Sequence, residues 1–214
     1  LAFYRLIRPT TVVKGQGKSW RYYTPTTETF DRAKHMFTKE PDTIDWLNTL
    51  KDGQTFWDIG ANIGIFSIYA ASIRNIDVLS FEPIYDTYAV FVANILVNQL
   101  SNCISPYNLA FAERTTNGTW FVEHWEAGSG DHRVEAGEYN EPLPHQYQAK
   151  LNILCYSIDD FIERFSLDVP NYIKIDVDGG ENKILRGAQQ SLRSDTLRSV
   201  LVEIDERLAT TKEE

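Results

Sequence analysis

The sequence predicts an α/β fold, with a doubly wound, mostly parallel sheet and helices on both of its faces. A strand, a glycine turn and a helix follow one another at residues 55–73 and again at 172–192. Between these units, buried-strand and helical patterns alternate from Asp77 to Ala110, which is typical of consecutive βαβ units. The 214 residues, of which 43% are hydrophobic, are enough for one compact domain.

The composition argues against nucleic acid or an anionic membrane as the main partner. The chain carries 30 acidic and 21 basic residues, a net charge of −9, and it has no run of lysines or arginines. The sequence shows no membrane span or signal peptide. Its two cysteines, Cys103 and Cys155, stand in apolar strand-like runs, so we expect buried thiols in a reducing, cytoplasmic compartment.

Residues 1–54 are predicted to form an N-terminal helical cap on the ligand-binding domain at 55–214. Residues 20–23 predict a short strand, and two helical patterns follow, at 27–39 and from an N-cap at Asp42. We expect the junction of the two helices, residues 38–40, to lie over the ligand pocket. The alternative is a plain surface corner.

The residues from Asp58 to Ser67 (DIGANIGIFS) make the first glycine turn. Gly60 and Gly64 allow positive φ and a close approach to a ligand, and Asn62 tolerates the left-handed region. The dehydrogenase fingerprint needs glycine at its first, third and sixth positions, and Asn62 and Ile65 break it. The remaining pattern, acid-x-Gly-x-Asn-x-Gly, is similar to the first motif of class I S-adenosylmethionine (SAM) methyltransferases.

Two further strand ends carry candidate binding residues. The predicted strand from Asp77 ends at Glu82, which lies 22 positions after Gly60, close to the ~20 expected of an acid that binds ribose hydroxyls. A helix at 85–100 and a third strand at 104–110 follow. The end of that strand, Asn108 to Ala110, stands where such folds contact adenine.

An added β-hairpin is predicted from the strand patterns at 118–122 and 150–156, with a lid at 124–149 between them. A loop of this length is usually functional or disordered. It contains His124, His132 and His145, and His132 is a candidate general base. A solvated loop without a catalytic histidine is the alternative.

The second glycine turn, after the strand at 172–175, gathers Asp176, Asp178 and Glu181. Ligands of open α/β sheets bind at the carboxyl ends of such strands. Massed carboxylates repel one another unless positive charge is present, which the sulfonium of SAM or a metal ion would supply. Glu181 alone could instead serve the helix dipole. A capped helix from Ser157 precedes this strand, and a fifth strand, 199–204, contains Glu203 near its end.

Together these segments resemble the FkbM family of SAM-dependent methyltransferases. The resemblance rests on DIGANIGIFS, FEP at 81–83, SIDDFI at 157–162, IKIDVDGGENKILRGA at 173–188 and VEID at 202–205, and it runs from about Phe37 to Asp205. Asp178 and Gly180 stand where the family's usual block has glutamate and alanine. The resemblance implies a Rossmann-like sheet of the class I methyltransferase type, methyl transfer usually to oxygen, and acceptors such as sugar hydroxyls of polysaccharides, glycolipids and secondary metabolites.

The resemblance also implies residue roles. The glycine turn would face the methionine part of SAM, Glu82 the ribose, and Asn108 with Ala110 the adenine, while Asp176 and Glu181 would be catalytic. The implied cofactor-binding residues stand at the first three strand ends: Asp58, Gly60, Ala61, Asn62, Gly64, Phe66, Ser67, Glu82, Pro83, Asn108 and Ala110.

Several alternatives stay open. A carboxylate such as Asp176, or a lid histidine, would take the acceptor's proton, or Asp176 with Glu203 or Asp205 would hold a divalent cation. The family's last two strands have no counterpart in this sequence, so we expect the sheet to lack them or a partner to supply them. An inactive or merely SAM-binding module of a longer chain, and a nucleic-acid or protein methyltransferase, are the rival functions. The oligomeric state and the acceptor are not predicted.

Overall fold

The computed structural model describes residues 9–130, 133–137, 146–177 and 179–204. Its centre is a five-stranded sheet in which all neighbouring strands are parallel, in the order β11-β10-β3-β4-β5. The strands are β3 (Thr55–Ile59), β4 (Asp77–Phe81), β5 (Ile104–Tyr107), β10 (Tyr172–Ile175) and β11 (Ser199–Val202). The predicted parallel sheet is confirmed, and its carboxyl ends form one edge.

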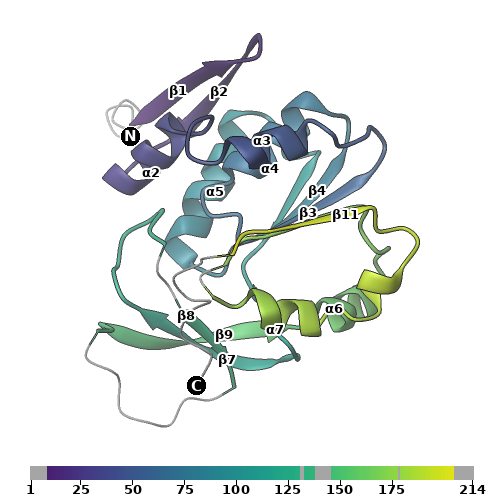
Figure 1. Cartoon of the computed structure of the whole chain (residues 1–214). Coiled ribbons are helices and arrows are strands. Elements are labelled where there is room, and N and C mark those ends of the chain that lie inside the picture. The colour runs from purple at the N-terminus through teal and green to yellow at the C-terminus, as the bar shows by residue number, and fades with distance from the viewer. Residues whose placement is uncertain (1–8, 131–132, 138–145, 178, 205–214) are drawn as a thin grey trace.

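Helices cover both faces of this sheet, as Figure 1 shows. One face carries α3 (Pro41–Leu47), α4 (Ile65–Ile73) and α5 (Tyr85–Val97), and the other carries α6 (Ile158–Phe165) and α7 (Glu181–Arg186). A short 3-10 helix, η1 (Ser191–Arg193), follows α7. The fold is therefore an α/β doubly wound sheet.

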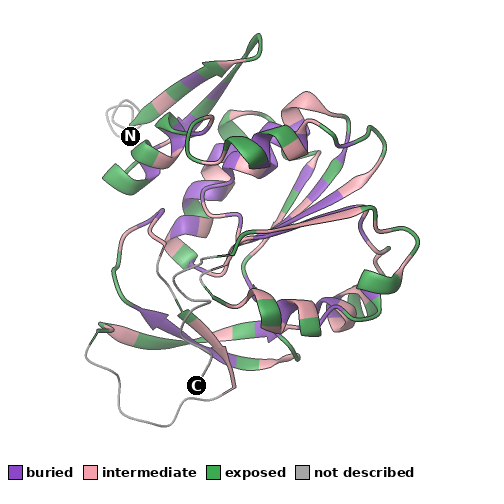
Figure 2. Ribbon diagram, viewed as in Figure 1, coloured by how far each residue is buried: buried purple, intermediate pink, exposed green. Residues whose placement is uncertain are grey.

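The strand residues form these two cores because they alternate. In β3, Phe56 packs in the core under α4, while the next residue, Trp57, packs in the core under α6. A parallel sheet covered on both faces leaves its central strands almost wholly buried, and all of β10 and all but the first residue of β3 are buried. Figure 2 colours buried residues purple, and such residues lie on the strands between the two helix layers. A polar side chain on these strands therefore needs a partner inside the protein.

The N-terminal segment contains more than the predicted helices. β1 (Thr10–Gly15) and β2 (Lys18–Tyr23) form an antiparallel hairpin, of which the sequence indicated only the second strand. α2 (Thr27–Lys34) follows from a capping box at Thr26, and α3 begins after Glu40. The predicted N-cap at Asp42 is wrong, because Pro41 takes the first helical position and places Asp42 inside the first turn.

A second sheet of four strands lies beside the carboxyl edge of the first. Its order is β6-β9-β7-β8, with β6 (Ala110–Phe111), β7 (Thr116–Val122), β8 (Arg133–Ala136) and β9 (Ala149–Tyr156). β7 pairs antiparallel with β9, as the predicted hairpin requires, and also with β8, which the sequence did not indicate.

Among the described residues, β11 is an edge strand of the central sheet. No helix in the described ranges is long and apolar enough to cross a membrane.

Candidate functional site

A cavity of about 380 Å³ opens at the carboxyl edge of the central sheet. This volume lies within the ~300–1,000 Å³ typical of small-molecule sites. One wall comes from the ends of β3, β4 and the β5–β6 connection, and another from the turn after β10. The second sheet contributes the third wall through residues 133–135 of β8.

The glycine turn has the backbone that its sequence predicts. Gly60, Asn62 and Gly64 have φ values of +82°, +49° and +83°. A Cβ atom at Gly60 would collide with the carbonyl oxygen of Asp176, so this glycine lets the ends of β3 and β10 approach each other. A Cβ at Gly64 would instead collide with the Phe91 ring, so Gly64 serves the packing of α5 and does not line the cavity.

Asp58 and Ser67 lie beneath the turn. Both are fully buried, and Ser67 Oγ donates to Asp58 Oδ2 at 2.5 Å. Burial raises the pKa of Asp58, an effect that nearby Lys174 opposes. Neither residue lines the cavity, and both support the turn from below. Their contact with a cofactor stays a prediction.

Glu82 is nearly buried at the end of β4 and lines the cavity. Its carboxylate accepts hydrogen bonds from the backbone N–H of Asn62 at 2.9 Å and of Ile84 at 2.7 Å. These bonds join the glycine turn to the next strand end. Asn108 is exposed and donates to the carbonyl oxygens of Glu82 and Pro83, so it holds this turn and is absent from the cavity lining.

Lys174 is the positive charge that the carboxylates of the second glycine turn need. Its side chain is 1% exposed, and Nζ lies 2.5 Å from Asp176 Oδ2 and 4.8 Å from the centre of the Phe66 ring. Burial lowers the pKa of Lys174, but the Asp176 and Asp58 carboxylates outweigh burial and raise it. Burial alone would raise the pKa of Asp176. The charge and the hydrogen bond of Lys174 act in the opposite direction, and the pKa of Asp176 is lowered, so Asp176 stays ionised.

Glu203 extends this charged group on the next strand. Its N–H donates to the Ile175 carbonyl at 2.9 Å, which places it just beyond β11 beside the end of β10. Partial burial of its carboxyl group, and then the nearby Asp176 and Glu40, raise the pKa of Glu203 to about 7. One carboxylate oxygen each from Glu40, Asp176 and Glu203 lie within 4.8 Å of one another, a spacing that a cation could bridge. Metal dependence stays an open prediction.

Glu181 begins α7 and accepts a hydrogen bond from the Gly179 N–H at 3.2 Å. It does not line the cavity, whereas Gly179, Gly180 and Lys183 do. This geometry favours the alternative role at the start of the helix, and a catalytic role for Glu181 stays a prediction. Asp178 and Asp205 lie outside the described residues.

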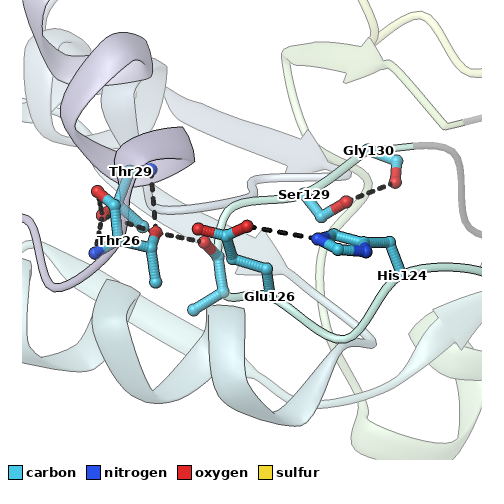
Figure 3. A network of polar contacts seen from close by, with 7 residues as sticks. Thr26, Thr29, His124, Glu126, Ser129 and Gly130 are labelled. Carbon is cyan, nitrogen blue, oxygen red and sulfur yellow. Dashed lines mark hydrogen bonds and ion pairs between the residues drawn. The ribbon is translucent and has the colours of Figure 1, made fainter.

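Residues 126–130 form a loop, here called the roof, that contributes Ser129 and Gly130 to the cavity lining. Figure 3 shows some of the polar contacts around this loop. Thr26 Oγ1 donates to the Ala127 carbonyl at 2.7 Å, Arg32 Nε donates to the Gly128 carbonyl, and the Gly128 N–H donates to Thr87 Oγ1 at 3.0 Å. Asn62 Nδ2 adds a longer bond of 3.3 Å to the Ser129 carbonyl. Three separate parts of the chain therefore hold the roof.

His124 is the lid histidine that lies within the described residues, and it does not line the cavity. His124 faces Glu126, with Nε2 3.2 Å from Oε2, and its side chain is 63% exposed (Figure 3). His132 and His145 lie outside the described residues.

Of the predicted cofactor-binding residues, five line the main cavity: Gly60, Asn62, Glu82, Pro83 and Ala110. Ala61 and Phe66 line a smaller hollow beside it, to which Lys39 and Glu40 of the expected 38–40 junction also belong. Sequence reasoning missed the cavity residues Arg32, Arg133, Glu135 and Lys183, and also Lys174 behind them. Lys174 could have been found from the sequence, because a lysine within a strand buried on both faces requires an acidic partner.

The strand order, the glycine turn and the cavity at the carboxyl edge define a Rossmann-like fold of the class I methyltransferase type. The Methyltransferase FkbM domain matches residues 58–213, and the chain belongs to this family of methyltransferases.

Individual proteins are more distant. The hexuronic acid methyltransferase AglP of Haloferax volcanii is 23% identical over 198 residues, which are 92% of this chain and 75% of AglP. Precorrin-6y C5,15-methyltransferase of Geobacter metallireducens is 15% identical, with a TM-score of 0.49 over 83% of this chain and 70% of its own. A putative transferase of Pyrococcus horikoshii, PH0793, is 23% identical, with a TM-score of 0.37 over 48% of this chain and 37% of its own.

Proposed function

We propose that this chain is a SAM-dependent methyltransferase that methylates an oxygen atom of a sugar. The observation that carries the proposal is the cavity, with the glycine turn and Glu82 on one wall and Asp176 on another. Membership of the FkbM family supports methyl transfer. The similarity to a hexuronic acid methyltransferase supports a sugar acceptor.

The residues of the cavity fit SAM. Gly60 lines the cavity at the glycine turn, and Pro83 with Leu109 and Ala110 offers apolar surface to an adenine ring. The Glu82 carboxylate lines the cavity at the end of β4, where it would accept hydrogen bonds from ribose hydroxyls. When bound, SAM would supply the methyl group of its sulfonium.

We expect the same cavity to orient the acceptor, and side chains at its edge to accept the acceptor's proton. The acceptor oxygen would gain the methyl group as the C–S bond of SAM breaks and S-adenosylhomocysteine leaves, and the acceptor's O–H proton would pass to Asp176 or, through it, to Glu203. Lys174 holds Asp176 ionised and makes it a weak base, while Glu203, with a pKa of about 7, suits a base that works near neutral pH. The exposed Glu203 can then release the proton to water.

This pair favours a hydroxyl over a carboxylate as the methylated group. A hexuronic acid offers both kinds of oxygen. Its carboxylate is ionised at neutral pH and needs no base, whereas a hydroxyl must lose a proton during transfer. A base in the cavity is useful only in the second case.

The proposal is tested by incubating the protein with methyl-labelled SAM and with glucuronic acid, its methyl glycoside or glucose. Label in a sugar product that survives mild alkali identifies a methyl ether and supports the proposal. Label that alkali releases identifies a methyl ester, and the carboxylate would then be the acceptor. If the protein binds neither SAM nor S-adenosylhomocysteine, the cofactor assignment is wrong.

A further inference from the structure

The smaller hollow beside the cavity joins the N-terminal segment to the glycine turn. Arg32 of α2 and Glu40, which precedes α3, line it from one side, and Ala61 and Phe66 line it from the other. It shares four residues with the main cavity, namely Arg32, Gly60, Asn62 and Asp176. The two spaces therefore adjoin at the glycine turn.

This hollow carries charges of both signs on side chains that are half-buried. Arg32 Nε donates to the Gly128 carbonyl, which fixes the guanidinium beside the roof. Glu40 Oε2 accepts from Thr43 Oγ1 at 3.3 Å, and a carboxylate oxygen of Glu40 lies within 4.8 Å of Asp176. Arg32 is close enough to Asp176 to lower the pKa of that carboxyl, after the larger effects of burial and Lys174.

A ligand that fills both spaces must have two unlike ends. The main cavity offers apolar surface and a hydroxyl-binding carboxylate, which suit a nucleoside. The hollow offers a guanidinium and a carboxylate, which suit a zwitterion. SAM has this composition, because its sulfonium joins the adenosine to an amino acid that carries an ammonium and a carboxylate.

We propose that Arg32 and Glu40 bind the amino-acid end of SAM, Arg32 at its carboxylate and Glu40 at its ammonium group. This inference rests on the proposed cofactor. Both residues precede residues 58–213, the part that matches the family domain, so the N-terminal segment completes the cofactor site. The 198-residue alignment to AglP is longer than the chain from Asp58 onward, so it includes part of this segment.

The test compares two ligands that differ only in the amino-acid end. S-Adenosylhomocysteine has it, whereas 5′-methylthioadenosine keeps the adenosine and the sulfur without it. Titration calorimetry measures both Kd values for the wild type, Arg32→Gln and Glu40→Gln. We expect each variant to weaken S-adenosylhomocysteine about tenfold or more and to leave methylthioadenosine within about twofold.

Lys34→Gln on α2 and Asp42→Asn on α3 are matched controls, because both residues are exposed and line neither space. Arg32→Lys keeps the charge without the fork, so it should retain part of the affinity even if Arg32→Gln loosens the roof. Unchanged binding of S-adenosylhomocysteine in both Gln variants overturns the proposal.

Two further results would also overturn it. Equal weakening of both ligands would show that the variants act through the fold. A requirement of S-adenosylhomocysteine binding for added Mg²⁺, which Glu40→Gln removes, would assign Glu40 to a cation. If the wild type binds neither ligand, the proposed function itself fails, and that outcome is distinct from the others.

Discussion

Lys174 Nζ lies 2.5 Å from Asp176 Oδ2, and the lysine side chain is 1% exposed. The two residues stand on opposite sides of the point where β10 ends, so one buried strand supplies both charges. Burial of either charge without the other would be costly. The pair therefore affects both the stability of the sheet and the ionisation of Asp176 at the carboxyl edge.

Replacing Lys174 with Met should destabilise the protein by about 3 kcal/mol at neutral pH, the lower end of the range for a broken buried ion pair. The lower end applies because Asp176 is 32% exposed and can regain some water. Urea unfolding measures the effect, with the exposed Lys51→Met as control. The double variant with Asp176→Asn should recover part of the loss, and its failure to do so would contradict the pairing.

Glu203 should make stability depend on pH. Its pKa is raised from 4.5 to about 7 in the folded protein, so between these values the folded state binds more protons than the unfolded state. The contribution of Glu203 is therefore most favourable below about pH 4.5 and is lost as the pH rises through about 7. Glu203→Gln should remove this decline. The test measures the unfolding free energy of the wild type and of Glu203→Gln at pH 5 and at pH 8. The same change between the two pH values in both proteins would exclude the raised pKa of Glu203.

The same titration should appear in catalysis. If Glu203 accepts the acceptor's proton, the rate at saturating substrate rises with pH and levels off above about 7. Glu203→Gln should lower the rate by about 10²-fold or more and flatten this rise, with the affinity for S-adenosylhomocysteine unchanged. A reduced rate with an unaltered pH profile would indicate a structural role for Glu203.

Gly60→Ala and Gly53→Ala form a matched pair. Both glycines have positive φ, +82° and +73°, but a Cβ at Gly53 meets nothing within 4 Å, whereas one at Gly60 collides with the Asp176 carbonyl. Gly53→Ala should cost about 1–2 kcal/mol of stability through its backbone alone. Gly60→Ala should cost about 1–3 kcal/mol more and should abolish binding of S-adenosylhomocysteine. Equal losses would show that the approach of β3 and β10 is unimportant.

Glu82→Gln should weaken adenosine and S-adenosylhomocysteine alike, by about tenfold or more, because both ligands carry the ribose. This pattern differs from that expected of Arg32 and Glu40, which act on the amino-acid end. The exposed Glu163→Gln serves as the control. Calorimetry with adenosine alone is the decisive measurement, and unchanged affinity would remove Glu82 from the ribose site.

Local patterns predicted much of the central sheet. The glycine turn, the strand that ends at Glu82 and the strand before Asp176 each depend on a few neighbouring residues, whose backbone preferences are visible in the sequence. The fold class and five cavity residues followed from them. The capped helix at Ser157 is confirmed for the same reason.

The remaining features depend on contacts between distant segments. Asp58 accepts a hydrogen bond from Ser67, Asn108 donates one to the Glu82 carbonyl, and neither residue lines the cavity. Arg32 and Glu40 meet the glycine turn only because α2 and α3 fold back over it. No local spacing marks such residues, and β8 likewise becomes a strand by pairing with β7.

The attachment of residues 126–130 has a kinetic consequence. Their hydrogen bonds reach α2, α5 and the glycine turn, so a molecule as large as the cavity cannot leave past this side unless several bonds break together. Such openings are slower than the motion of a free loop. If SAM is the cofactor, we therefore expect the release of S-adenosylhomocysteine, rather than methyl transfer itself, to limit the turnover rate.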